Sequence, residues 1–254
     1  MDILECIAIA EARTYKVVKS NEIIQRARFH LSLLEQKTLL YIISMIKPQD
    51  KEADPVLEYV FNIQDYCKIC GIDYKNGRNY EYIKNCLKKL RDQSIWISKP
   101  DGTETTVSWL NKITVSKQSG KVIVRLDDDM IPYLFNLKDC FTQYELYNTL
   151  VMQSQYSIRF YELMKSYAFV KHKTVELEQL KKSISAEGYQ RYPDFRRYIL
   201  DVAVKEVNEY TDLEISYTPI TKGRKVVQIE FCIRTKSTVE RAIAQNKAIH
   251  ELDD

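Results

Sequence analysis

Several arginines gather at the start of one predicted helix. The segment YPDFRRYILDVAVKEVNEY begins at Tyr192, and Pro193 suits the first turn of a helix. Arg196 and Arg197 lie in that turn, and Arg191 precedes it. A guanidinium can donate two parallel hydrogen bonds to a phosphate or to the edge of a guanine. The exposed start of this helix, with its arginines and the Tyr192 hydroxyl, is therefore a candidate binding site for nucleic acid.

A second basic cluster follows at a predicted hairpin turn. Lys222, Arg224 and Lys225 surround Gly223 in the segment ITKGRK, and glycine is typical of tight turns. In a helix-turn-helix module the N-terminal end of the recognition helix enters the DNA major groove. A basic hairpin beside that helix is placed to contact the phosphate backbone.

The competing interpretation is that these charges are simply solvated. On a regular helix Arg197 and Asp201 are four residues apart, and such a surface pair contributes only about 0.2–0.5 kcal/mol. Basic exposed turns are common, so the first cluster alone does not decide the question. The second basic cluster, at the hairpin turn, favours the interpretation that this surface binds nucleic acid.

One acidic residue interrupts the apolar face of the same helix. At about 100° per residue, one side contains Phe195, Ile199, Val202, Ala203 and Tyr210. Glu206 falls in the middle of that side, where an unpaired carboxylate would be costly. We predict an ion pair between Glu206 and Arg159 of an earlier helix. The alternative is a rolled helix that lets Glu206 reach water.

The first half contains a comparable set of polar and basic residues at its own third helix. The predicted contacts are Lys75, Arg78, Asn79, Lys84 and Lys88, with Lys89 beside them. Lysine and asparagine dominate this set, which therefore suits phosphates more than base edges. Glu81 and Asp92 dilute its charge, and a solvated lysine face is the alternative.

Motifs for metal binding are weak. Cys67 and Cys70 have C-x-x-C spacing, but zinc sites need four ligands and no second pair exists. We expect both thiols to pack in the core. The run Asp127 to Asp129 precedes MIPYLF, so capping of a helix explains it better than metal binding.

Motifs for catalysis or cofactor binding are equally weak. The histidines are widely separated, at His30, His172 and His250. No triad context, no His-x-His pair for a strand-nicking enzyme and no G-x-x-x-x-G-K phosphate loop is found. We expect no catalytic activity, no cofactor and no metal.

These candidate residues depend on elements that the chain repeats in one order. In the first half, the capping-box spacing from Ser32 to Glu35 predicts a helix to about Ile46. A short helix from Phe61 to near Gly71 and a helix over Tyr80–Gln93 follow. Alternating β-type segments come next, over residues 94–99, 105–116 and 121–126.

The second half repeats that order. The predicted helices span Ser154–Val170, Thr174–Ile184 and Pro193–Thr211, and the predicted hairpin spans Leu213–Ile233. Three helices and a hairpin form a winged helix, so the predicted fold class is α+β with two tandem winged-helix domains. We place the domains at 1–138 and 139–236, followed by a polar C-terminal tail at 237–254.

The segment between the two halves contains no glycine or proline from Leu137 to Gln155. It is therefore not a flexible tether, and the two domains should keep a fixed relation.

Composition limits the choice of protein class. The chain has 254 residues, 45% hydrophobic and 29% charged, which is typical of a globular protein. Its net charge of +3 is too small to identify a nucleic-acid binder, so the distribution of charge must decide. The N-terminus does not read as a signal peptide, and the longest apolar run, Leu39–Ile46, is far too short for a membrane span. We expect reduced cysteines and a cytoplasmic location.

Three segments resemble the winged-helix replication initiator proteins of iteron-containing bacterial plasmids. They are Val17–Ile46, Phe141–Tyr167 and Phe195–Ile233. The most specific pieces are YSIRFYE and the ordered landmarks FRR, A, EVN, TDLE and KGRKV. The likeness spans Val17–Arg234 and is looser in the first domain after Lys47.

The resemblance implies a replication initiator that binds double-stranded DNA at directly repeated origin sequences (iterons). The second domain would read bases through Arg196 and Arg197, with Ile220–Val226 as its wing, and the first would grip the adjacent backbone through Tyr80–Gln93. It also implies a homodimer in equilibrium with the monomer, repression of its own gene, and host partners such as an initiator and a helicase in the bacterial cytoplasm. A winged-helix transcriptional repressor without an origin role remains the alternative.

Overall fold

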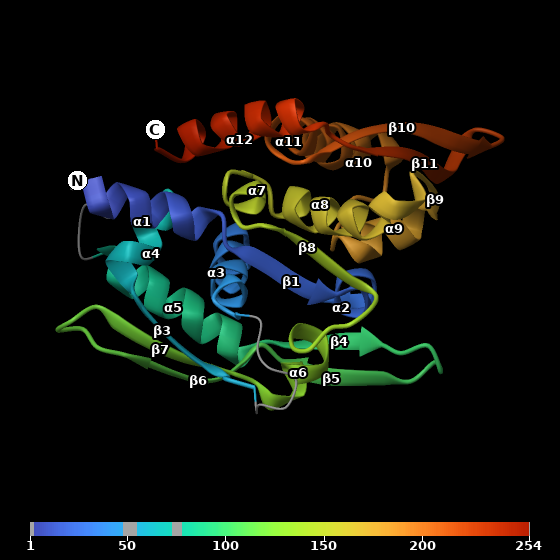
Figure 1. Cartoon of the computed structure of the whole chain (residues 1–254). Coiled ribbons are helices and arrows are strands. Elements are labelled where there is room, and N and C mark those ends of the chain that lie inside the picture. Colours follow the sequence, from blue (N-terminus) through green and yellow to red (C-terminus); the bar gives the residue numbers. More distant parts are fainter. Residues whose placement is uncertain (1–2, 48–54, 73–77, 254) are drawn as a thin grey trace.

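The chain forms two winged helices, and the second lies over the first (Figure 1). The fold was obtained as a computed structural model, which describes residues 3–47, 55–72 and 78–253. One large hydrophobic core cluster contains buried residues of both halves, and a small second cluster lies around Tyr147. The predicted α+β fold with tandem winged helices is confirmed.

The first winged helix contains three helices and a three-stranded sheet. The helices are α3 (Leu33–Ser44), α4 (Ile63–Ile69) and α5 (Arg78–Asp92), and the sheet has the order β3 (Glu58–Asn62), β7 (Lys121–Leu126), β6 (Leu110–Val115). The predicted capping box is present, because Glu35 N donates to Ser32 Oγ at 3.3 Å and Ser32 N donates to Glu35 Oε2 at 2.9 Å. The predicted start at Phe61 falls instead in β3, and Asn62 caps α4.

The predicted β segment at 105–116 is two strands of different sheets. β5 (Glu104–Ser108) pairs with β4 (Ser94–Ser98), which also pairs with the short β2 (Ala27–Arg28). The chain turns at Trp109, which is 1% exposed, before β6 joins the other sheet. The β4–β5 hairpin is therefore an addition to the winged helix.

The predicted structural roles of two polar motifs are confirmed. Cys67 and Cys70 are buried in the core, and burial raises the pKa of the Cys67 thiol to about 12. The Asp127 side chain accepts from Asp129 N at 3.1 Å and caps η1 (Asp128–Met130), which leads into α6 (Ile131–Leu134).

The second winged helix repeats the arrangement of the first. Its helical elements are α8 (Gln155–Tyr167) with η2 (Ala168–Val170), α9 (Leu177–Ser183), α10 (Tyr192–Phe195), the π turn η3 (Arg196–Leu200) and α11 (Asp201–Tyr210). The sheet order is β10 (Leu213–Lys222), β11 (Lys225–Thr235), β9 (His172–Glu176). In both domains the strand before the second helix thus pairs with the last strand of the hairpin.

One predicted helix boundary in this domain is wrong. Residues 174–176 were expected to be helical, but they belong to β9, where Val175 pairs with Ile229. The backbone hydrogen bonds of β11 override the local helical pattern, which begins only at Leu177.

The connecting segment is ordered and belongs to a small sheet. β8 (Phe141–Glu145) pairs antiparallel with β1 (Lys16–Ser20), and α7 (Tyr147–Leu150) follows it. Before and after β1 lie α1 (Ile3–Arg13) and α2 (Asn21–Arg26). The residues called a polar tail form a helix from position 238, α12 (Thr238–Asp253). Among the described ranges, no helix is long and apolar enough to cross a lipid bilayer.

A buried cluster of charged side chains joins the two halves. Glu162 of α8 forms an ion pair with Lys19 of β1 and accepts a hydrogen bond from the Tyr144 hydroxyl of β8. Arg159 Nη1 lies 3.7 Å from Glu162 Oε2. All four residues are at most 3% exposed. Burial lowers the pKa of Lys19, and the nearby Arg159 cation lowers it further, while Glu162 opposes the shift.

Arg159 also binds backbone from both domains. Its Nη2 donates to the carbonyls of Ile24 and Ala27 at 3.3 Å and of Ser183 at 2.9 Å. Its guanidinium lies 4.2 Å from the ring centroid of Phe29. The side chain therefore fixes α2 of the first half against α9 of the second.

The predicted ion pair between Arg159 and Glu206 is wrong. Arg159 pairs with Glu162 on its own helix, three residues away. Glu206 instead accepts from Gln153 N at 3.0 Å, and its Oε2 is buried without a hydrogen-bond partner in the described structure. The prediction assumed a regular helix, whereas the π turn changes which side of α11 faces α8.

Replacing Glu162 by glutamine tests the importance of this cluster. We expect Glu162→Gln to lower the free energy of unfolding by about 3–5 kcal/mol, because two buried cations lose their counter-charge. Urea unfolding at neutral pH measures the loss.

The matched control is Glu104→Gln, since Glu104 is half exposed and lies 3.9 Å from Arg28. This surface pair should contribute only about 0–1 kcal/mol. Equal effects of the two substitutions would show that the buried cluster stabilises the fold no more than a surface ion pair does.

Candidate nucleic-acid interface

The third helix of the second domain contains a π turn at the predicted arginines. η3 covers residues 196–200 between α10 and α11. A π turn inserts one extra residue, so side chains five apart become neighbours. Arg196 Nε accordingly lies 3.4 Å from Asp201 Oδ2, and the expected surface pair between Arg197 and Asp201 is replaced by this one.

Because Asp201 pairs with Arg196, the Arg197 side chain is available to bind a ligand. Its guanidinium lies 5.3 Å from the ring centroid of Tyr198, and both side chains are exposed. Within the described ranges, Arg197 makes no ion pair. Arg191 is also exposed and lies 3.7 Å from Asp194, a weak surface contact. The three predicted arginines thus gather at one exposed helix start.

Tyr192 departs from its predicted role. Its side chain packs against the core, and its hydroxyl is buried without a hydrogen-bond partner among the described residues. Tyr198, which is 53% exposed, is the tyrosine whose side chain reaches solvent here. The prediction of Tyr192 as a direct contact is corrected, because its ring serves the packing of the helix start.

A buried lysine positions the loop before this helix. Lys181 of α9 is 1% exposed, and its ammonium donates to the Gln190 carbonyl at 3.3 Å and to Glu178 Oε1 at 2.8 Å. It also lies 5.8 Å from the ring centroid of Phe195. We did not predict this residue, since a lysine in a polar helix segment normally indicates solvent exposure.

The basic wing lies at the end of the β10–β11 hairpin. Lys222, Arg224 and Lys225 are all exposed, and Gly223 takes a φ of +64° in the turn between them. β9 pairs only with residues 228–232 of β11, so the tip extends beyond the three-stranded sheet. No ion pair involves these three cations in the part of the chain that the structure describes.

A hydrogen bond connects the wing strand to the arginine helix. The Tyr217 hydroxyl of β10 donates to Asp201, which also pairs with Arg196. Burial, followed by the bond to Asp201, raises the pKa of Tyr217 above its usual range. The orientation of Arg196 is therefore coupled to the hairpin.

The first-domain helix α5 presents paired lysines. Lys84 lies 3.4 Å from Glu81, Lys88 lies 3.9 Å from Asp92, and Lys89 lies 3.8 Å from Glu35. Lys88 and Lys89 remain largely exposed. Lys75 lies outside the described residues, as do the side chains of Arg78 and Asn79. The first-domain contacts stay a prediction.

The structure adds a first-domain wing that the sequence did not single out. The β6–β7 turn contains Lys117 and Gly120, and with Tyr80 of α5 these residues line one surface hollow. Asn62 Nδ2 donates to Ser119 O at 2.9 Å, which holds the turn against α4. A lysine in a glycine-containing turn was the available signal, as in the second wing.

The described residues contain no group of three or more histidine, cysteine, aspartate or glutamate side chains that could hold a metal ion. What the interface offers is a set of cationic donors on an ordered scaffold, an arrangement suited to a polyanion.

Tyr217→Phe tests the coupling between the wing and the helix. Loss of the hydroxyl should lower the free energy of unfolding by about 0.5–1.5 kcal/mol, because Asp201 loses a donor. Thermal or urea unfolding measures it. Tyr82→Phe is the control, since Tyr82 is 58% exposed on α5. A Tyr217→Phe variant as stable as the control would remove this contact from the account.

Comparisons with known proteins agree with this architecture. Residues 16–165 match the family model for the first winged helix of initiator replication proteins, and residues 176–233 match the model for the second. The PI protein of Escherichia coli is 28% identical over 155 residues, 53% of this chain, and the match spans half of its length (50%). An uncharacterised 27.6 kDa protein of Escherichia coli is 21% identical over 234 residues, 84% of this chain and 93% of its own length.

A solved structure has the same fold. The crystal structure of the Pi initiator protein in complex with iteron DNA superposes with a TM-score of 0.69 at 20% sequence identity, and the match covers 89% of this chain and 99% of that one. The family models together cover most of the chain, including both sets of helices and both wings described above. The chain therefore belongs to the initiator replication protein family.

Proposed function

We propose that this protein initiates plasmid replication by binding directly repeated origin sequences, the iterons, as double-stranded DNA. The observation that carries the proposal is the exposed start of the second-domain helix. Arg196 and Arg197 lie there, and the same domain carries a basic wing that forms no ion pair with any described residue. Family membership supports the initiator role. The Pi initiator, whose fold the chain shares, was crystallised with iteron DNA.

The two domains have different parts in this proposal. The second-domain helix enters a major groove, with Arg197 pairing with a base edge and the wing holding phosphates. The first domain contacts the adjacent backbone through α5, with Lys84 and Lys88, and through the β6–β7 turn. The protein acts by binding and not by catalysis, in the bacterial cytoplasm.

Further partners are part of the same proposal. A dimer formed through the first domain represses the protein's own gene, in equilibrium with a monomer that binds iterons. The origin-bound protein recruits host replication proteins such as an initiator and a helicase. A dedicated transcriptional repressor is the alternative. Several direct repeats of about two helical turns beside the gene favour the initiator, whereas one inverted repeat favours the repressor.

Arg197→Ala tests base reading. We expect it to weaken binding to the cognate site by about 1–3 kcal/mol and to relax discrimination at one base position, because a bidentate contact is lost. Titrations against the cognate duplex and duplexes substituted at single positions measure both effects. Equal weakening on every duplex would assign Arg197 to phosphate binding.

Lys222→Ala tests the wing. It should weaken cognate and random DNA alike and reduce the slope of log K against log salt by about one unit, because one phosphate contact is removed. Binding isotherms at several salt concentrations provide the slope. An unchanged slope would mean that the wing tip does not contact the backbone.

A further inference from the structure

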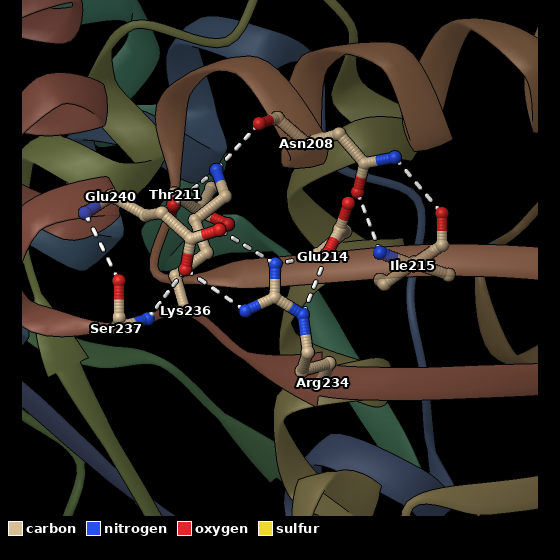
Figure 2. Close-up of polar contacts among 8 residues, drawn as sticks. All are labelled: Asn208, Thr211, Glu214, Ile215, Arg234, Lys236, Ser237 and Glu240. Atoms are coloured by element: carbon tan, nitrogen blue, oxygen red, sulfur yellow. Dashed lines mark hydrogen bonds and ion pairs between the residues drawn. The ribbon is translucent and has the colours of Figure 1, made fainter.

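The last helix, α12, begins in a polar cluster on the second winged helix. Arg234, near the end of β11, donates to Glu214 Oε2 of β10 at 2.6 Å and to Glu240 of α12 at 2.8 and 2.9 Å (Figure 2). Ser237 N donates to Glu240 Oε2 at 2.7 Å, and Glu240 N donates to Ser237 Oγ at 3.4 Å. These contacts fix the direction in which α12 leaves the sheet.

The same cluster attaches α12 to the end of the arginine helix. The ammonium of Lys236 donates to the carbonyls of Asn208 and Thr211, at the C-terminal end of α11 (Figure 2). The Asn208 side chain in turn bonds both backbone groups of Ile215, at 2.9 and 2.6 Å. A cation at a helix C-terminus is favourable, so α12 moves with α11 and the second-domain sheet.

The middle of α12 packs along the connection between the domains. Ala248 is fully buried against Tyr147 and Val151, in and after α7. Lys247 lies 3.1 Å from Glu209 of α11. This part of the helix therefore packs on the connecting segment and the second domain.

The far end of α12 reaches the first domain. Arg13, at the end of α1, has a side chain only 3% exposed, and its Nη1 lies 2.7 Å from Asp253 Oδ1. Its Nη2 donates to Leu252 O at 3.4 Å. The same guanidinium donates to Ile69 O at 3.0 Å and Lys68 O at 3.2 Å, in α4. One buried cation thus joins α12 to the second helix of the first winged helix.

A glycine permits this close approach. Gly71 follows α4 with a φ of +64°, and a Cβ there would lie 2.9 Å from the Leu252 carbonyl oxygen. Only a residue without a side chain allows the end of α12 to lie on this turn.

We propose that Arg13 and the end of α12 form a latch that sets the angle between the two winged helices, and with it the spacing of their DNA contacts. The buried cluster around Arg159 is one attachment between the domains, and it lies near α2 and α9. The latch is a second attachment, where the end of α1 contacts the end of α12 on the side of the molecule that carries both chain termini (Figure 1). Because the latch lies apart from the Arg159 cluster, it resists rotation of the domains about that cluster, in addition to the core that the two halves share.

The two helices that form the latch lie outside the segments that the family models match. α1 and α12 both lie outside residues 16–165 and 176–233, which the family models match. Its consequence for DNA rests on the proposed function, because two domains held at a fixed spacing bind two adjacent sites with a high effective concentration. Arg13 is thus a positioning residue, because its buried side chain binds α4 and α12 and is not itself one of the predicted DNA contacts.

Two full-chain variants test the latch from opposite sides. Arg13→Gln removes one positive charge. Asp253→Lys raises the net charge by two and places a cation beside Arg13, which repels it. Asp253 is 58% exposed, so its replacement leaves the fold intact. Lys247→Gln is the control, since it changes the charge of α12 without touching the first domain. Spin labels at Lys112→Cys and Glu230→Cys, with the exposed Cys6, Cys140 and Cys232 replaced by serine, report the distance between domains by double electron–electron resonance.

Both latch variants should shift or broaden that distance distribution. The distribution of the control should match that of the protein with the native Arg13 and Asp253. Both should also lose about tenfold in affinity for a duplex long enough for both domains. Their affinity for a duplex shortened from the first-domain end should be unchanged. Distance distributions that stay the same in both variants would overturn the latch. A protein with an intact latch that binds all DNA alike would instead refute the proposed function, and the distances would still decide the latch.

Discussion

The structure depends on one buried carboxylate that two domains share. Glu162 lies on the first helix of the second winged helix, yet Lys19 reaches it from the first strand of the chain. A carboxylate and two cations are stable in the interior only if their geometry is fixed and their remaining donors are satisfied. Arg159 Nη2 donates to carbonyls from both domains, whereas its Nε and Nη1 have no hydrogen-bond partner among the described residues. The domains therefore keep a defined relation, which the proposed binding of both domains to adjacent DNA requires.

Much of the fold follows from local patterns in the sequence. The capping box at Ser32 and the glycine turn at Gly223 each require only neighbouring residues, and both are where they were expected. The repeated order of helices and hairpin then predicted both winged helices. The exposed position of Arg197 also followed from local pattern, because the side chain projects from the start of an amphipathic helix.

Other features depend on contacts between distant residues and could not be predicted in this way. The π turn moves the partner of Asp201 from Arg197 to Arg196, and no helical periodicity indicates where the extra residue enters. Arg159 pairs with Glu162 and donates to carbonyls that are distant in the sequence, although the helical pattern indicated Glu206 as its partner. The helix α12 has only a weak apolar stripe, because its buried residues are two alanines. Its ionic partner Arg13 lies far away in the sequence, so no local pattern indicates the contact.

Guanine methylation interference tests the central claim most directly. Methylation at N7 blocks the major-groove atom to which an arginine donates, while the phosphate backbone stays intact. We predict that methylated guanines within each direct repeat prevent binding, at positions in the groove that the Arg196–Arg197 helix start enters. Binding that is insensitive to N7 methylation throughout the repeats would contradict base reading in the major groove.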